Sequence, residues 1–171
     1  SSDLRVQQLL HSAQSGETEH ALCYLDLDQF KVINDICGHI AGDQLLRELG
    51  QVLKAKIRQR DTLARLGGDE FGLLLEDCSL RYAERVANDM QQAVQQFRFV
   101  WEGRTFGIGV SIGLIPISRS SDSLTTLLSQ ADAACYAAKD AGRNRIHVHD
   151  DADTDLVKDR KSTRLNSSHP S

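Results

Sequence analysis

The chain has 171 residues, of which 40% are hydrophobic and 26% are charged, and this is enough apolar material for the core of one soluble globular domain. Its net charge of −4 at pH 7 argues against a protein that holds long nucleic acid by its phosphates, whereas a small phosphorylated ligand bound through a metal stays compatible. The sequence has no apolar run of the roughly 20 residues that a membrane span needs, and no signal-peptide pattern at its N-terminus.

The first half of the chain contains an apolar strand that ends in acidic residues. The strand is predicted over residues 21–28, and its apolar character is continuous until Asp26 and Asp28 appear. Because the side-chain period of a strand is two, both acids point to one face if the strand stays regular, and one of them can face a metal. The other elements predicted here are a helix over 4–13, a short helix over 30–36, a turn over 37–43 and a helix over about 44–58.

Two short apolar runs, 62–66 and 71–75, meet at the sequence Gly67-Gly68-Asp69-Glu70 and predict a β-hairpin with carboxylates at its tip. The glycines allow positive φ and let phosphates approach the backbone, while two adjacent carboxylates repel each other unless a cation or a proton joins them. The pattern therefore favours a metal site, with an ordinary solvated turn as the alternative.

The second half supplies helices and strands that complete an α+β domain. The order of elements predicts an antiparallel-rich sheet with helices on its faces, over a domain of residues 1–150. Residues 151–171 are interpreted as a linker remnant and a vector-derived tail, without order. The elements predicted in this half are a helix over 80–97, a hairpin of 99–101 with 107–117 around Glu102-Gly103-Arg104, a helix over 123–141 between a Ser123 cap and Gly142, and a strand over 145–149.

The four cysteines are scattered along the chain without CxxC spacing, which disfavours a zinc site. At least three of them lie in apolar surroundings that are typical of core or helix-packing positions. We interpret them as reduced thiols of a cytoplasmic protein. The four are Cys23, Cys37, Cys78 and Cys135.

Four motifs in a fixed order carry a family resemblance that extends from about residue 21 to 149. They are Asp26-x-Asp28-x-Phe30-Lys31-x-x-Asn34-Asp35, then Gly38-His39-x-x-Gly42-Asp43, then Gly67-Gly68-Asp69-Glu70-Phe71, and then Ala131-Asp132 through Tyr136-x-x-Lys139-x-x-Gly142-Arg143-Asn144. This series resembles the GGDEF family, the diguanylate cyclases. The resemblance implies an α+β fold like that of adenylate cyclases and polymerase palm domains. The implied reaction joins two GTP molecules into cyclic di-GMP and releases two pyrophosphates.

The resemblance also implies the residues of the reaction centre. Asp26, the backbone carbonyl of Leu27, and Asp69 correspond to ligands of two Mg²⁺ or Mn²⁺ ions, for which oxygen donors are suited. Asp69 also corresponds to the proton acceptor, and Glu70 completes the metal or proton network. Lys31 matches the position that stabilises the pentacovalent phosphate.

For the substrate, the resemblance assigns guanine recognition to Asn34 and Asp43, with His39 nearby. A carboxylate accepts hydrogen bonds from guanine N1–H and the 2-amino group, and adenine offers neither donor on that edge, so the site favours GTP over ATP. His39 taken alone also suits a structural hydrogen bond. The resemblance further places Phe30, Gly67 and Gly68 in the substrate site.

Lys139 and Arg143, one turn apart near a helix end, match the family's contacts to the β- and γ-phosphates, although such a pair taken alone is typical of a solvated helix end. Each site binds one GTP and sees half of the product, so the resemblance implies an active homodimer. The resemblance also covers Arg58-Gln59-Arg60-Asp61, which matches the family's RxxD product-inhibition site. In that site arginine pairs with a phosphate or stacks on guanine, aspartate accepts hydrogen bonds from the guanine edge, and Arg85 fits a secondary contact. Taken alone, RxxD is also compatible with ordinary surface charge.

The opening segment typical of the family, Asp-x-Leu-Thr-Gly-Leu-x-Asn-Arg, is absent, so we expect a domain from a longer protein with an upstream sensor and a downstream EAL domain. The full-length protein could be membrane-anchored outside this segment. Two alternatives to an active cyclase stay open. One is a catalytically silent module that senses GTP or cyclic di-GMP, for which a broken Gly-Gly-Asp-Glu-Phe motif would be expected. The other is a structural dimerisation domain that binds no nucleotide.

Overall fold

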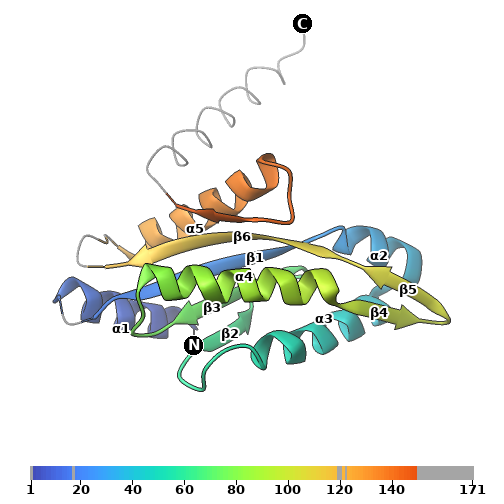
Figure 1. The fold of residues 1–171 in the computed structure, drawn as a ribbon, viewed down its shortest axis with the longest axis horizontal. Coiled ribbons are helices and arrows are strands. Elements are labelled where there is room, and N and C mark those ends of the chain that lie inside the picture. Colours follow the sequence, from blue (N-terminus) through green and yellow to red (C-terminus); the bar gives the residue numbers. More distant parts are fainter. Residues whose placement is uncertain (1, 17, 119–120, 122, 150–171) are drawn as a thin grey trace, which may run out of the picture.

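A computed structural model describes residues 2–16, 18–118, 121 and 123–149, and these form an α+β fold with one main sheet between helices (Figure 1). The strand order of this five-stranded sheet is β2-β3-β1-β6-β7, with antiparallel neighbours throughout except for the parallel pair β6 and β7. The predicted fold class is therefore confirmed. The elements are α1 (Ser2–Gln14), β1 (His20–Asp28), α2 (Phe30–Cys37), α3 (His39–Lys54), β2 (Thr62–Arg65), β3 (Glu70–Leu75), α4 (Leu80–Gln96), β4 (Arg98–Trp101), β5 (Arg104–Gly107), β6 (Gly109–Ile117), α5 (Leu124–Asp140) and β7 (Ile146–Val148).

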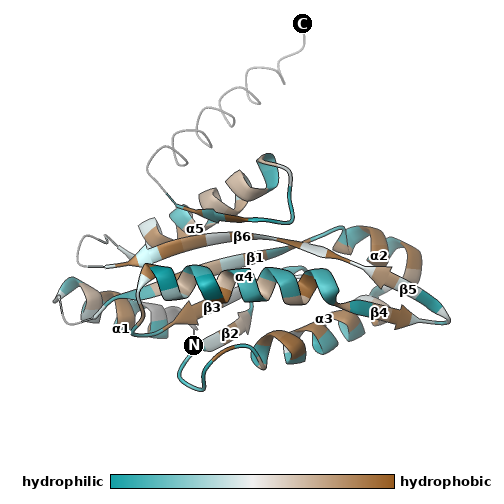
Figure 2. Ribbon diagram, in the orientation of Figure 1, coloured by the Kyte–Doolittle hydropathy of each residue, from teal (hydrophilic) through white to brown (hydrophobic). Residues whose placement is uncertain are grey.

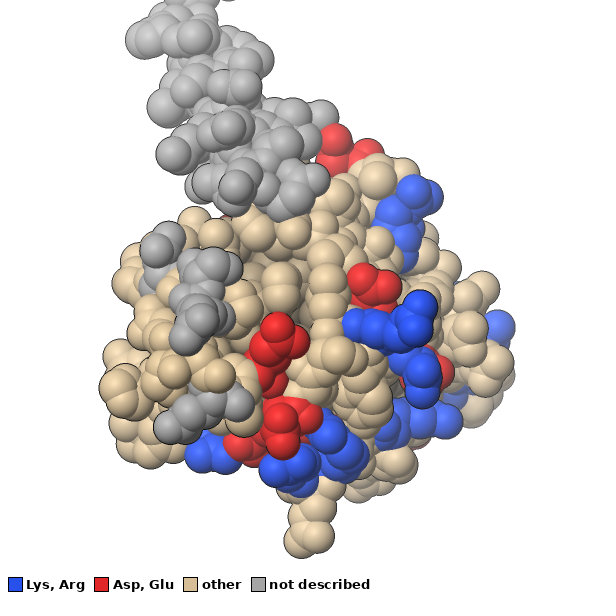
Figure 3. All heavy atoms as spheres, turned by 60° about the vertical axis from the view of Figure 1, so that its left-hand side comes forward, with Lys and Arg blue, Asp and Glu red and all other residues tan. Residues whose placement is uncertain are grey.

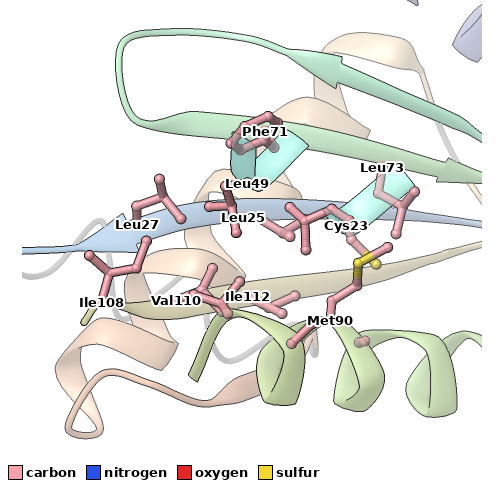
Figure 4. Close-up of a cluster of buried hydrophobic side chains, with 14 of the residues drawn as sticks. Cys23, Leu25, Leu27, Leu49, Phe71, Leu73, Met90, Ile108, Val110 and Ile112 are labelled. Atoms are coloured by element: carbon pink, nitrogen blue, oxygen red, sulfur yellow. The ribbon is translucent and has the colours of Figure 1, made fainter. Parts of the chain in front are cut away.

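The alternation of side chains along β1 divides the core into two layers. Cys23, Leu25 and Leu27 lie along one side of the strand, in the same cluster as Leu49 of α3 and Met90 of α4 (Figure 4). Residues on the other side of the sheet belong to a second cluster with α1 and α5. Figure 2 shows mainly hydrophilic residues along α4 and hydrophobic residues along β3, as expected for a surface helix and for a buried strand. Asp26, at an even position of β1, thus lies on the α5 side.

Helix α5 packs closely against β6 because the residues between them have small side chains or none. A β-carbon added at Gly113 of β6 would collide with the backbone nitrogen of Cys135 and would lie 2.8 Å from the carbonyl oxygen of Ala131. The buried residues of α5 are mostly alanine. This close approach fixes the helix whose last turn carries Lys139.

We expect Gly113→Ala to lower the free energy of unfolding by about 1–3 kcal/mol, because the added methyl group meets backbone that has no room to move. Gly50→Ala in α3 is the matched control. Its β-carbon would make an ordinary contact, 3.8 Å from the Phe71 ring, so better helix propensity should raise stability by about 0.5–1 kcal/mol. Urea unfolding of both variants measures the difference, and a Gly113→Ala protein as stable as the parent would contradict the close packing.

Three predictions of the sequence analysis are wrong. Residues 39–43 are the first turn of α3, because Gly38, at φ 93°, ends α2 and the next helix begins one residue later. That helix also ends earlier than predicted, at Lys54. The hairpin partner of β4 is β5, and β6 instead pairs with β1 in the main sheet.

The predicted tail, 151–171, lies outside the described residues, so the domain boundary stays a prediction. Within the described ranges, no helix has both the length and the apolar character needed to cross a membrane.

Candidate active site

The hairpin of β2 and β3 brings the two tip carboxylates beside the end of β1. Glu70, the first residue of β3, lies directly opposite Asp26 in the antiparallel register, so the two side chains share a face. The backbone N–H of Leu27 donates to the carbonyl of Asp69 at 3.0 Å, which ties the turn to the same strand. The predicted hairpin therefore places Asp69 and Glu70 next to Asp26.

The cation nearest to this cluster comes from the far end of the domain sequence. Lys139, in the last turn of α5, forms an ion pair with Oδ2 of Asp26. Burial lowers the pKa of Lys139, but the hydrogen bond and charge of Asp26 outweigh it and leave the pKa raised. Burial raises the pKa of Asp26 against the opposing effect of Lys139, and burial together with the charges of Asp26, Asp69 and Asp132 raises the pKa of Glu70.

These carboxylate oxygens suit a hard divalent cation whose coordination shell is completed by oxygens of the substrate. Within the part of the chain that the structure describes, no three His, Cys, Asp or Glu side chains form a ready metal cage. Mg²⁺ is usually held by one or two carboxylates together with phosphate oxygens and water, so a complete cage is not required. Oδ1 of Asp26 is buried and has no hydrogen-bond partner among the described residues, which leaves it available as a ligand. The Asp26 carboxylate thus fits such an ion, and the hydrogen bond between Leu27 and Asp69 keeps the other two predicted ligands nearby.

Asp28, which the sequence analysis paired with Asp26 without giving it a role, holds the site together. Its carboxylate is buried and accepts hydrogen bonds from the Ser111 hydroxyl at 2.9 Å and from the backbone N–H of Asn144 at 2.9 Å. Asn144 follows Arg143, and both have positive φ. Asp28 therefore fixes the loop that carries the predicted phosphate contact Arg143. The two-residue period of β1 predicts the face on which Asp28 lies, but nothing nearby in the sequence indicates that Ser111 and Asn144 are its partners.

Helices α2 and α3 carry the predicted guanine contacts. The Asn34 amide lies 3.5 Å from Nδ1 of His39, and Oδ1 of Asn34 is buried without a partner among the described residues. A β-carbon at Gly42 would collide with Asn34 and lie 3.1 Å from the Phe30 ring, so only glycine lets the two helices meet this closely. The side chain of Asn34 is thereby held in place with an unused acceptor.

Two further predicted residues on these helices are exposed. Lys31 lies in the first turn of α2, and the carboxylate of Asp43 lies 3.6 Å from the guanidinium of Arg65, which the sequence analysis did not select. Asp43 and Arg65 border a groove of about 620 Å³ along α3 that also includes Arg47 and Lys54. Gly67 and Gly68, in the tip of the hairpin, are likewise exposed.

The RxxD residues lie at the opposite end of the hairpin from its tip, because they precede β2. The guanidinium of Arg58 donates to both oxygens of Asp61, at 3.0 and 2.9 Å, donates to the carbonyl of Glu76 at 2.6 Å, and lies 4.7 Å from the centre of the Tyr82 ring. The Asp61 side chain is fully buried, whereas that of Arg58 is 33% exposed. Asp61 therefore presents no free edge to a ligand in this structure.

Arg85, one turn after Tyr82 on α4, is exposed. Figure 3 turns the end of the molecule that contains α1 forward, and basic and acidic side chains lie side by side there instead of forming a continuous basic surface. In this region Arg60 pairs with Asp77, at 3.8 Å, and Arg5 pairs with Glu76.

The site thus consists of an acidic hairpin tip that faces the end of a buried strand on a five-stranded α+β sheet. The sequence matches the family "Diguanylate cyclase, GGDEF domain" over residues 2–145. The chain therefore belongs to the GGDEF domain family, and it is a domain of the diguanylate cyclase class.

Named relatives agree with this assignment. The probable diguanylate cyclase DgcE of Escherichia coli (strain K12) is 45% identical over 146 residues, which are 85% of this chain and 13% of DgcE. The GGDEF domain of TpbB, or YfiN, from Pseudomonas aeruginosa has a TM-score of 0.85 at 31% identity, with 91% of both chains covered. The GGDEF domain of DgcB from Caulobacter crescentus, solved in complex with c-di-GMP, has a TM-score of 0.79 at 28% identity and covers 85% of this chain and 86% of its own. The chain thus spans only a small part of the length of DgcE.

Proposed function

We propose that this domain condenses two GTP molecules into cyclic di-GMP. The observation that carries the proposal is that Asp26, Asp69 and Glu70 meet at the end of the central strand β1 beside Lys139, in a chain of the GGDEF family. Neighbouring carboxylates repel each other unless a cation binds between them, and the lysine beside them can bind phosphate. Transfer of a nucleotidyl group requires both kinds of group.

The reaction that these residues support is attack of one ribose 3′-oxygen on the α-phosphorus of the facing GTP. The bond from that phosphorus to the bridging oxygen breaks, pyrophosphate leaves, and the reaction occurs once in each direction to close the ring. Asp69 accepts the proton of the 3′-hydroxyl, and Lys31 stabilises the charge that develops on the α-phosphate. Lys139 and Arg143 hold the β- and γ-phosphates. Two Mg²⁺ or Mn²⁺ ions held by Asp26, Leu27 and Asp69, with Glu70 beside them, would activate the hydroxyl and stabilise the leaving pyrophosphate.

Base selection in this proposal belongs to α2 and α3. The amide group of Asn34 and the exposed carboxylate of Asp43 suit the hydrogen-bonding edge of guanine, with His39 beside Asn34. Because each domain carries one nucleotide site, product formation needs two domains with their sites facing each other. We therefore propose a homodimer as the active species.

A concentration series tests the proposal. The purified domain is incubated with GTP and Mg²⁺ at increasing protein concentration, and cyclic di-GMP is quantified by chromatography. We expect product to rise more steeply than linearly with protein. If GTP binds but no product forms, even when a fused coiled coil forces dimers, the domain is a nucleotide sensor and the proposal is wrong.

We also propose that cyclic di-GMP inhibits the domain at Arg58 and Arg85. The guanidinium of Arg58 lies over the Tyr82 ring, and the exposed part of the side chain can contact a guanine or a phosphate. Arg85 lies on the same helix as Tyr82, one turn further on. Asp61 supports the site by holding Arg58 in place, because its own carboxylate is buried. This differs from the direct guanine contact that the family resemblance implies for Asp61.

We expect Arg85→Ala to raise the cyclic di-GMP concentration that half-inhibits the reaction by about tenfold, the loss of one charged hydrogen bond. Arg58→Ala should also relieve inhibition, but it removes the charged partner of the buried Asp61 carboxylate and should lower the melting temperature as well. Initial rates at increasing product concentration measure both effects. Arg81→Ala, at another exposed arginine of α4, is the control, and unchanged inhibition in both test variants would remove this site.

The remaining predictions concern the protein around the domain. An upstream sensor, a downstream EAL domain and a cytoplasmic location stay predictions, as does the expectation that nucleic acid is not a partner. DgcE is an example of a relative in which the matching segment is 13% of the length.

A further inference from the structure

Lys139 is the cation in a group of acidic side chains at the hairpin tip. It forms an ion pair with Asp26, and Asp69, Glu70 and Asp132 lie close enough for their charges to act on this group. The Asp26 side chain is 14% exposed and that of Lys139 is 32% exposed, so the ion pair lies partly out of water. One oxygen of Asp26 is bonded to Lys139, while the other is buried without a partner among the described residues.

We propose that Lys139 is the internal counter-ion of Asp26 in the nucleotide-free protein and that GTP draws it away, so that one side chain couples cation binding to nucleotide binding. This inference rests on the proposed function. A divalent cation that approaches Asp26 meets the positive charge of Lys139, which opposes binding. A triphosphate offers Lys139 several negative oxygens instead, and once Lys139 bonds to them, both oxygens of Asp26 are available to the cation.

The side chain of Lys139 is suited to such an exchange. Its flexible stem reaches Asp26 from the last turn of α5, and about a third of it is in contact with solvent, so the ammonium group can change partners without a movement of the helix. The close contact of α5 with Gly113 keeps the backbone in place while it does so. In this way the domain would bind a cation weakly until GTP arrives.

The inference predicts opposite effects of one substitution on two ligands. Lys139→Met should bind Mn²⁺ about tenfold more tightly without nucleotide, because the opposing charge is gone. It should bind Mn²⁺ with 3′-deoxy-GTP, an analogue that lacks the attacking hydroxyl, about tenfold more weakly, because a phosphate contact is gone. A lysine with only a structural role would weaken both when removed.

The experiment titrates each protein with Mn²⁺, first alone and then at saturating 3′-deoxy-GTP, and follows free Mn²⁺ by electron paramagnetic resonance. Arg143→Met is the matched control. Its exposed side chain lies outside the Asp26 ion pair, so its loss should weaken nucleotide binding and change nucleotide-free Mn²⁺ affinity by less than about twofold. Lys139→Arg keeps the charge and should keep weak Mn²⁺ binding. Thermal melts check the fold, and Lys139→Gln replaces Lys139→Met if the latter does not fold.

The outcomes separate the inference from the proposed function. Tighter nucleotide-free Mn²⁺ binding in Lys139→Met, with Arg143→Met unchanged, supports the counter-ion role. Unchanged or weaker Mn²⁺ binding in Lys139→Met, while the parent protein binds Mn²⁺ with 3′-deoxy-GTP, overturns the inference and leaves the proposed function in place. A parent protein that binds neither ligand overturns both.

Discussion

Asp69→Asn should reduce the rate of cyclic di-GMP formation by at least about a thousandfold while the protein stays folded. Asp69 is half-buried in the hairpin turn, and its backbone carbonyl accepts the hydrogen bond from Leu27. The substitution leaves that backbone contact in place, but an amide neither accepts the proton of the 3′-hydroxyl nor binds a divalent cation as a carboxylate does. Turnover of GTP at fixed protein concentration measures the loss.

Asp89→Asn is the control for this variant, since Asp89 is an exposed aspartate on α4. Its activity should equal that of the parent protein. The melting temperatures of both variants should lie close to that of the parent, because neither substitution removes a buried contact between side chains. Activity near the parent level in Asp69→Asn would refute the assignment of Asp69 as metal ligand and proton acceptor.

Asp28→Ala should lower the free energy of unfolding by about 2–4 kcal/mol. The substitution leaves the fully buried Ser111 hydroxyl and the N–H of Asn144 without their acceptor and opens space beside them. Urea unfolding at neutral pH measures the effect. Asp28→Asn, which keeps one acceptor oxygen, should lose less.

Asp89→Ala is again the surface control, with an expected change within about 0.5 kcal/mol. The loop after α5 should also loosen in Asp28→Ala, because its N–H at Asn144 is no longer held. We therefore expect weaker binding of 3′-deoxy-GTP through Arg143. An Asp28→Ala protein as stable as the parent would show that the two hydrogen bonds contribute nothing to the fold.

Much of the candidate site follows from short-range patterns. The period of two along β1 placed Asp26 and Asp28 on one face, and the apolar runs around the glycine pair predicted the hairpin that carries Asp69. Both are confirmed because strand alternation and turn geometry depend on neighbouring residues. Local patterns failed at Gly38, where a single residue separates two helices and the predicted longer turn does not exist.

The partners of these residues depend on contacts far apart in the sequence. Lys139 and Asp26 are 113 residues apart, and Asp28 is 83 residues from Ser111, so no window of sequence relates them. The same holds for β6. Its apolar run fits a hairpin with β4 as well as a central strand beside β1, and only burial of both of its faces in the assembled domain decides for β1.

The sequence by itself predicted which side chains to assign to the proposed reaction, because that chemistry needs particular groups in local motifs. The tertiary structure decided what those groups do in the absence of a ligand. It pairs Lys139 with Asp26, buries Asp61 under Arg58, and ties Asp28 to the loop of Arg143. The physical reason is that period and propensity determine the face on which a side chain lies, whereas its partner depends on which elements the core brings together.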